Sequence, residues 1–467
     1  MSRNKELVKN TSYVVIGSIG AKLVAFLMLP LYTSWLSPED YGVTDIIDTY
    51  AGLLLFIVAL DISDAIFIFP VGASKGDITK YFSTGMIFSL ACCCACAIIF
   101  YFISLFNFQN EFFKNIWLIY GILVSNLFQK YTQDFCRGIK KMSVFSWTGI
   151  IQAFGLAIMS CFLIPFWGVA GFVVACMISY LLSGVFAFVY SKSYNYLSLT
   201  AFSYPFLKEM LTYSIPLVPT SIMWWLVSSL NRPLMEQYTG MFAIGLFAVA
   251  NKLPSLINLV FGFFQKAWVV TVVEEYQKPD FSDYYNRVFR VIMAVQSLMC
   301  IILTIVSKLF VTIMTSEAYY DAWRYIPLLS LSVLLSNTSA FCGTIFSAYR
   351  KTKYIFYSVC VGGVAAVVLN FLLIPYVGLL GACLAICFSH MLNMISRIIF
   401  SSKMVKFESS LYMFTQILII TIVYLAALQS KIYMCIVIYS VGLLMYYLTN
   451  RNVLKVLISK MHQRLPF

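Results

Sequence analysis

The sequence predicts an all-α protein that crosses a membrane about fourteen times. Of its 467 residues, 61% are apolar and only 11% are charged, whereas soluble domains carry about 25% charged residues. The apolar residues also gather in long runs, and a membrane-spanning helix needs about 20 of them. This composition excludes a soluble enzyme, a disordered chain and a secreted disulfide-rich protein, and it leaves no room for a sizeable soluble domain.

The apolar runs give fourteen predicted spans. Because the runs are long and lack regular turn signals, they favour helices over barrel strands. The first six lie at residues 12–35, 42–70, 82–106, 113–135, 143–165 and 168–190. The next six lie at 212–237, 243–272, 285–313, 323–347, 354–375 and 378–400, and two more at 411–429 and 432–449. The first run is too long for a signal-peptide core of roughly 7–15 residues, so we expect a permanent span.

The positive charges indicate the orientation of the spans. With the N-terminus on the cytoplasmic side, 23 Lys and Arg residues fall in inside segments and four in outside segments. Cytoplasmic loops carry an excess of Lys and Arg, so this asymmetry predicts an even number of spans with both termini cytoplasmic. It also explains the net charge of +13 without a nucleic-acid partner. The outside segments are very short and provide no extracytoplasmic catalytic loop.

A repeat divides the chain into two halves. Residues 163–171 (LIPFWGVAG) match residues 373–381 (LIPYVGLLG) at an offset of 210. Each Pro-x-x-Gly predicts a tight turn between two spans. The copies lie six spans apart, and an even offset preserves orientation, so the repeat is parallel. We expect an N-terminal six-helix lobe at 1–205, a C-terminal six-helix lobe at 206–403, two additional helices at 404–450 and a basic cytoplasmic tail at 451–467.

The cysteine and histidine residues indicate packing rather than chemistry. Thirteen Cys lie almost entirely in apolar runs, and Cys93 and Cys96 have CxxC spacing. Within a hydrophobic span we expect small buried thiols there, not a metal or redox site. Neither His390 nor His462 has a neighbouring metal ligand in the sequence. No P-loop motif is present, which argues against ATP hydrolysis. We therefore expect neither a metal nor another cofactor.

Besides the Lys and Arg residues already assigned to the inside and outside segments, eleven charged residues fall inside the predicted spans, where charge is costly and usually functional. They are Lys22, Asp45, Asp48, Asp61, Asp64, Lys130, Asp134, Arg232, Glu236, Lys252 and Lys266. Nine of the eleven lie on the first two spans of each half. This distribution predicts that these four spans line a central polar cavity between the halves.

Five of these residues are the predicted site. At a rise of about 1.5 Å per residue, Lys22 and Lys252 lie near the middle of their spans. With Arg232, they form the expected anion-binding set. Asp61 and Asp64 are three residues apart on one predicted helix face, and we expect them to be the coupling carboxylates.

Several of the charges also have a simpler interpretation. Snorkelling to the membrane interface explains Asp45, Glu236 and Lys266, and it remains open for the three cations of the predicted site. Lys130 and Asp134 are four residues apart and are expected to pair along one helix.

Two stretches near the N-terminus resemble a known family. Residues 29–33 (LPLYT) and 36–42 (LSPEDYG) resemble the first span and loop of Wzx-type bacterial polysaccharide flippases, which transport O-antigen and capsule units. That family belongs to a superfamily that also contains multidrug and toxic-compound extruders and lipid II flippases. The chain differs from the family at one position of the second span. Many members carry Arg near the end of this span, whereas this chain has the apolar residues 65–69 (AIFIF) there.

The middle of the chain resembles the seventh and eighth spans of the same family. The matching stretches are 213–219 (YSIPLVP), the pair Asn231-Arg232 and 243–252 (AIGLFAVANK). Asn231 stands where many members carry Asp, so the charges of the site differ from the family pattern.

The resemblance implies a non-enzymatic flippase of the bacterial plasma (inner) membrane. Its substrate would be an undecaprenyl-pyrophosphate-linked oligosaccharide, moved from the inner to the outer leaflet by alternating access and coupled to H⁺ or Na⁺. Its partners would be this lipid-linked substrate, membrane lipids, and a polysaccharide polymerase with a chain-length regulator. Two alternatives remain. An exporter of a drug or another lipid-linked substrate would favour a net acidic cavity, and a glycan polymerase or ligase would need a large outside loop.

Overall fold

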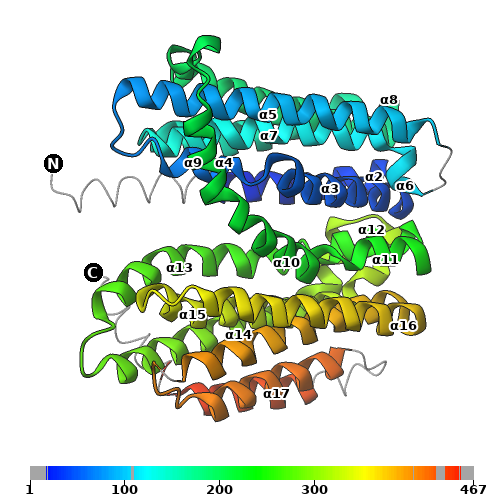
Figure 1. Cartoon of the computed structure of the whole chain (residues 1–467). Helices are drawn as coiled ribbons and strands as arrows, with labels where there is room; N and C mark the ends of the chain where they lie inside the picture. Colours follow the sequence, from blue (N-terminus) through cyan, green and yellow to red (C-terminus); the bar gives the residue numbers. More distant parts are fainter. Residues whose placement is uncertain are drawn as a thin grey trace, which may run out of the picture. The chain divides into compact units, whose positions relative to one another are not determined.

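The structure is a computed structural model that describes residues 17, 19–106, 110–402, 404–427, 437–451 and 453. Within these residues every regular element is a helix, and nine helices are long and apolar enough to cross a bilayer (Figure 1). The predicted all-α polytopic membrane fold is therefore confirmed. The extreme N-terminus, the first residues of the last predicted span (432–449) and almost all of the predicted basic tail at 451–467 lie outside the described residues.

The chain forms two compact units, which we describe separately. The first comprises Met1–Trp225 and Gly240–Gly245, and the second Leu226–Thr239 and Leu246–Phe467. The lobe boundary predicted at 205/206 falls within α9 (Tyr204–Ser214), which packs with the first unit.

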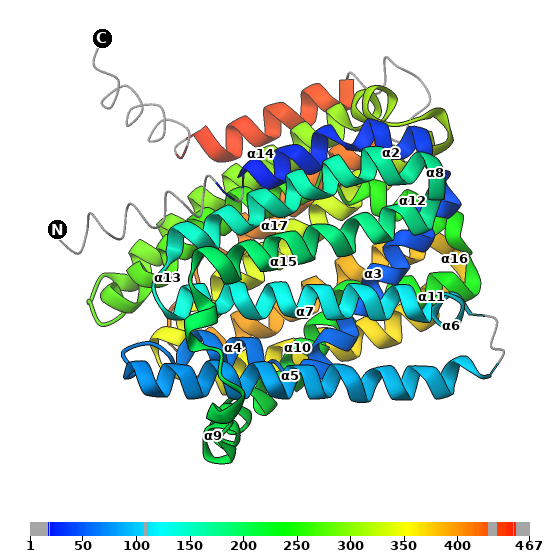
Figure 2. The ribbon, with the colours of Figure 1, turned by 90° about the horizontal axis from the view of Figure 1, so that it is seen from above.

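The first unit is organised around one helix, α7 (Ile116–Gly138). Its other helices are α2 (Leu29–Trp35), α3 (Pro38–Ala59), α4 (Ile62–Ile68), α5 (Lys75–Ser104), the short α6 (Glu111–Lys114), α8 (Met142–Tyr190) and α9. The 3-10 turns η1 (Ser193–Tyr196), η2 (Leu199–Ala201) and η3 (Ile215–Leu217) flank α9, and α10 (Val218–Ser229) begins in this unit. α3, α4, α5 and α8 all contact α7, and α5 and α8 run alongside it in Figure 2. The predicted CxxC serves packing, since Cys93 and Cys96 are buried among apolar side chains.

The second unit is organised in the same way around α15 (Ile326–Ala348). It contains α11 (Asn231–Tyr238), the second half of α12 (Met241–Ala250), α13 (Ser255–Glu275), α14 (Phe281–Met314), η4 (Glu317–Arg324), α16 (Lys353–Ser401) and α17 (Ser410–Ala427). Residues 437–451 are also helical. α13, α14 and α16 contact α15. Stacked aromatic side chains fill this core, with the rings of Trp268 and Phe341 4.9 Å apart.

The two predicted Pro-x-x-Gly turns are the tips of two helical hairpins. α8 and α16 each contain two spans, and the chain reverses at Gly168 (φ 52°, ψ −125°) and Gly378 (φ 62°, ψ −136°). Glycine adopts this positive φ without steric cost. Three residues beyond each turn, a second glycine packs closely against the preceding arm of the hairpin. A Cβ added at Gly171 would stand 2.2 Å from the Leu163 backbone oxygen, and one added at Gly381 would stand 2.4 Å from the Leu373 backbone oxygen. The predicted repeat therefore has the same backbone geometry in both copies.

Three predicted spans are interrupted. The span at 42–70 comprises α3 and α4, separated by Leu60 and Asp61 in left-handed conformations. The span at 212–237 comprises α10 and α11, and the span at 243–272 comprises α12 and α13. Interrupted helices expose backbone polar groups within a span, and such groups are tolerated only where protein or water satisfies them.

Candidate functional site

The predicted site residues are distributed over both units. Lys22, Asp61 and Asp64 belong to the first, and Arg232 and Lys252 to the second. The structure places four of the five at or next to the helix interruptions just described. The central cavity between the halves stays a prediction from the sequence.

Asp61 is a buried carboxylate at the interruption between α3 and α4. Its φ is 51°, that of Leu60 is 48°, and a left-handed residue other than glycine costs about 1–2 kcal/mol. Its side chain is 2% exposed. The Ser221 hydroxyl donates to Asp61 Oδ2 at 2.8 Å, and Lys130 Nζ lies 3.9 Å from Oδ1. A buried charge needs such partners. Ser221 of α10 and Lys130 of α7 therefore stabilise the carboxylate of a residue whose backbone is strained.

Asp61 belongs to a larger group, which we term the acid–base cluster and which comprises Asp61, Asp64, Lys130, Asp134 and Arg137. Arg137 donates to Asp134 Oδ1 at 3.0 Å, and Asp134 also interacts electrostatically with Lys130 and Asp64. Lys130 therefore acts on Asp134 through its charge, but the ion pair within 4 Å is the one between Lys130 and Asp61. Lys130 reaches across to the interruption between α3 and α4, and the likewise buried Asp134 has Arg137 as its hydrogen-bonded cation. With three carboxylates and two cations, the cluster carries a formal charge of −1.

Asp61 and Asp64 do not share the continuous helix face that the sequence predicted. Asp61 precedes the first turn of α4, where it bonds through its backbone oxygen to the Asp64 N–H at 2.9 Å. The Asp64 side chain is half-buried. The two carboxylates thus differ in environment, and only Asp61 is fully enclosed. α4 has seven residues after Asp61, so the carboxylate lies roughly 10 Å from the end of this helix.

Arg232 is held near the start of α11. Its guanidinium donates to the Ser228 carbonyl at 2.9 Å, in the last turn of α10. The guanidinium also lies 4.9 Å from the centre of the Phe247 ring. These contacts give the half-buried cation a defined position.

The two lysines have different surroundings. Lys252 lies in the turn between α12 and α13, half-buried, and its backbone oxygen accepts a bond from the Ser255 hydroxyl at 2.7 Å. Lys22 is exposed on the helix Ile19–Trp35, which precedes α3. Their role in anion binding stays a prediction.

One of the 23 cations counted in the inside segments is buried in the second unit. Arg397, near the end of the predicted span at 378–400, lies in α16 and is 3% exposed. Its guanidinium donates to Ser358 Oγ at 3.0 Å and to the Ser339 oxygen at 2.8 Å. It therefore joins both arms of the α16 hairpin to α15. Hydropathy did not reveal this role because the partners are a hydroxyl and a backbone carbonyl. Ser221 was missed for the same reason.

Comparison with known proteins identifies a family and a fold. The family model described as "Polysaccharide biosynthesis protein" matches residues 7–272. No curated protein matches the chain.

Among solved structures, the chain is similar to "Lipid II flippase MurJ, inward closed conformation". The TM-score is 0.73 at 13% identity, over 97% of this chain and 100% of that chain. It is also similar to an outward-facing multidrug resistance MATE family transporter (TM-score 0.55, 13% identity, 85% and 95% covered). A MOP superfamily transporter from Pyrococcus furiosus is a third (TM-score 0.59, 15% identity, 89% and 96% covered). At such low identities the similarity concerns the fold alone.

Proposed function

Because the chain belongs to the polysaccharide biosynthesis protein family, we propose that it flips an undecaprenyl-pyrophosphate-linked oligosaccharide from the inner to the outer leaflet of the bacterial plasma membrane. The observation that carries the proposal is the placement of ionisable side chains at interruptions of membrane-spanning helices. Asp61, Arg232 and Lys252 all occupy such positions. In transporters, interrupted helices typically build the sites for charged substrates and coupling ions near the bilayer midplane.

The physical task explains why such a protein needs interior polar groups. A sugar headgroup must cross about 30 Å of hydrocarbon. Each of its hydroxyls would lose roughly 2–7 kcal/mol without a hydrogen-bond partner. The pyrophosphate adds negative charge. Arg232 matches phosphate oxygens with its planar fork, and Lys22 and Lys252 supply further positive charge. These cations favour an anionic substrate over a cationic drug.

The acid–base cluster is the proposed coupling element. At a formal charge of −1, one H⁺ or Na⁺ makes it neutral, and no other cofactor is needed. Neutralising Asp61 weakens its attraction to Lys130 and its acceptance of the Ser221 bond. Since Ser221 lies on α10, cation binding at Asp61 is transmitted to the seventh span. α10 is also attached to α3 through Trp225 Nε1, which donates to the Thr49 oxygen at 3.1 Å, so the two spans respond together.

The proposal places both termini in the cytoplasm. It also places the transport step before a polysaccharide polymerase and its chain-length regulator, which use the unit on the outer leaflet. The chain itself would make or break no covalent bond.

A gene deletion tests the proposed function. The strain should lose one surface glycan while lipid-linked repeat units accumulate in the inner leaflet, and the intact gene should restore export. A Lys192→Gln variant, altered at an exposed loop residue, serves as the matched control and should also restore export. If repeat units instead reach the outer leaflet and stay unpolymerised, the chain acts as a polymerase and the proposal is wrong.

A further inference from the structure

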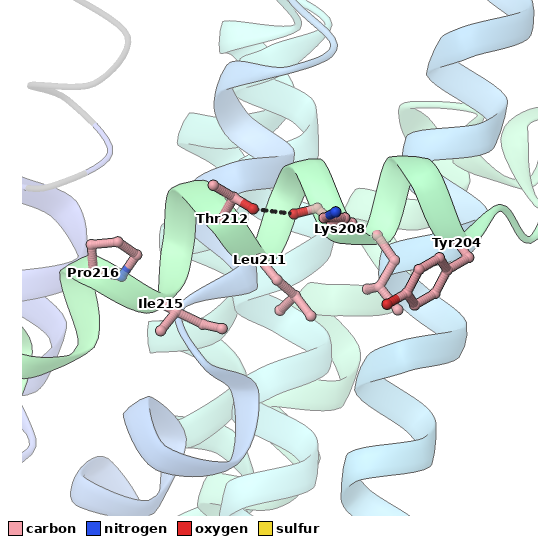
Figure 3. A pocket seen from close by; sticks show the side chains of 7 residues that line it. Tyr204, Lys208, Leu211, Thr212, Ile215 and Pro216 are labelled. Carbon is pink, nitrogen blue, oxygen red and sulfur yellow. Dashed lines mark hydrogen bonds between the residues drawn. The ribbon is translucent and has the colours of Figure 1, made fainter.

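A groove of 350 Å³ follows α9 in the first unit. Six of its lining residues are labelled in Figure 3: Tyr204, Lys208, Leu211, Thr212, Ile215 and Pro216. Tyr204, Leu211 and Ile215 project from the same side of the helix (Figure 3). The volume lies in the usual range for small-ligand sites, about 300–1,000 Å³.

The groove exists because α9 has two apolar faces. Leu207 and Met210 are buried in the core of the unit, together with Tyr81 and Tyr131. The groove face is exposed: Tyr204 is 69% exposed and Ile215 47%. An exposed apolar helix face at a membrane surface lies in the boundary between headgroups and acyl chains.

The charge within the groove is positive. Lys208 is the one charged residue among the described residues that line it. Lys80, with Nζ 5.1 Å from the centre of the Phe206 ring on α9, is already paired with Asp77 at 3.8 Å. Glu209 lines a second groove that shares Lys208 and Thr212 with the first, and it accepts a bond from the Tyr81 hydroxyl at 2.7 Å. The Glu209 carboxylate is therefore occupied by Tyr81 and does not line the first groove.

The sequence places this segment at the cytoplasmic surface. α9 begins before the predicted seventh span at 212–237 and follows an inside segment. Leu199, Phe202 and Tyr204 are exposed there, and aromatic side chains are typical of the headgroup level. The cytoplasmic leaflet contains anionic lipids, which attract Lys residues near its surface.

We propose that the α9 groove binds an anionic phospholipid of the inner leaflet. An acyl chain lies along Tyr204, Leu211 and Ile215, and the Lys208 ammonium binds the headgroup phosphate. This lipid is separate from the transported substrate. Because α9 leads through η3 into α10, the bound lipid supports the cytoplasmic arm of the helix that carries Ser221.

Photolabelling tests the proposal with the full chain in lipid nanodiscs. The probes are phosphatidylglycerol and phosphatidylcholine, each with a diazirine in one acyl chain, and mass spectrometry identifies the labelled peptides. We expect phosphatidylglycerol to label residues 204–216 several-fold more than phosphatidylcholine. Lys208→Gln should remove that difference, and Lys208→Arg should keep it. Lys192→Gln, altered at an exposed residue outside the groove, should label as the unmodified chain does.

Three outcomes would overturn the proposal. Equal labelling by the two probes would mean that the groove takes any acyl chain. If a Lys208→Gln variant elutes normally on gel filtration and its labelling is unchanged, Lys208 does not bind the headgroup phosphate. Displacement of the phosphatidylglycerol label by an equimolar polyprenyl pyrophosphate would assign the groove to the transported substrate. None of these results depends on whether transport is observed, so the test is separate from that of the proposed function.

Discussion

Asp61 Oδ1 and Lys130 Nζ lie 3.9 Å apart and join the interruption between α3 and α4 to the middle of α7. The carboxylate is 2% exposed, whereas the Lys130 side chain is 29% exposed. The Ser221 hydroxyl completes the arrangement from α10. Segments of the second, fourth and seventh predicted spans therefore meet at one ionisable group. A change in its charge alters contacts with all three.

We expect Asp61→Asn to abolish gradient-driven transport. The amide keeps the size of the side chain but can neither pair with Lys130 nor bind a coupling cation. Lys130 would lose its ion-pair partner, so the variant should also melt at a lower temperature. The measurement is uptake of a lipid-linked oligosaccharide in vesicles with and without an imposed ion gradient. Asp64→Asn is the matched control and should have a smaller effect, because Asp64 is only half-buried.

A double variant separates coupling from stability. Asp61→Asn with Lys130→Met removes both members of the ion pair, so the melting temperature should recover while transport remains uncoupled. Full gradient-driven transport by the Asp61→Asn variant would remove Asp61 from the coupling role.

The hairpins could be predicted from the sequence because their signal is local. Pro165 and Gly168 recur as Pro375 and Gly378, and a turn needs a glycine at one defined backbone position. The long apolar runs predicted the remaining spans for a similar reason, since the bilayer sets a minimum helix length. The prediction of the hairpins and of the long spans therefore does not depend on tertiary contacts.

The interruption at Asp61 could not be predicted in this way. Leu60 and Asp61 include neither glycine nor proline, yet both adopt positive φ. Their conformation depends on Ser221 and Lys130, which are distant in sequence. The sequence predicted that Lys130 pairs with its helix neighbour Asp134 and did not reveal its contact with Asp61. Pairing between helices depends on burial, and burial is known only from the fold.

Alanine at Gly171 should destabilise the first hairpin. A Cβ there would stand 2.2 Å from the Leu163 oxygen, a backbone atom that cannot move aside cheaply. Overpacking of this kind costs about 1–3 kcal/mol, so thermal unfolding in detergent should begin at a lower temperature. Gly149→Ala in the same hairpin is the control, since no atom lies within 4 Å of its added Cβ. Equal melting temperatures for the two variants would contradict the close approach.

Replacing Arg232 with Gln should reduce transport without unfolding the protein. The Gln amide can still donate to the Ser228 carbonyl, but the positive charge is lost. We expect about a tenfold or larger loss of export, because an ionised donor bonds phosphate roughly twice as strongly as a neutral one. Arg324→Gln, at an exposed residue of η4, should export normally. If the Arg232 variant exports normally too, Arg232 serves only to cap α10.

A reporter fused after Phe467 should be active only in the cytoplasm. This follows from the distribution of Lys and Arg between the two sides of the predicted spans. A cytoplasmic fluorescent reporter should be bright, and a periplasmic phosphatase at the same site should be inactive. Phosphatase activity there would require an odd number of spans and would overturn the orientation on which the proposed direction of transport depends.

The remaining prediction concerns Lys22 and Lys252, which come from different halves of the chain. If both contribute positive charge to the path of a pyrophosphate, Lys22→Ala and Lys252→Ala should each remove surface glycan while the amount of protein in the membrane stays unchanged. Replacement by Arg should preserve part of the export, because the positive charge remains although the planar guanidinium differs in shape from the ammonium group. Lys266→Ala is the matched control: this exposed lysine of α13 is interpreted as snorkelling to the interface, so its loss should leave export intact. Equal export by all three Ala variants would show that none of these lysines contacts the substrate.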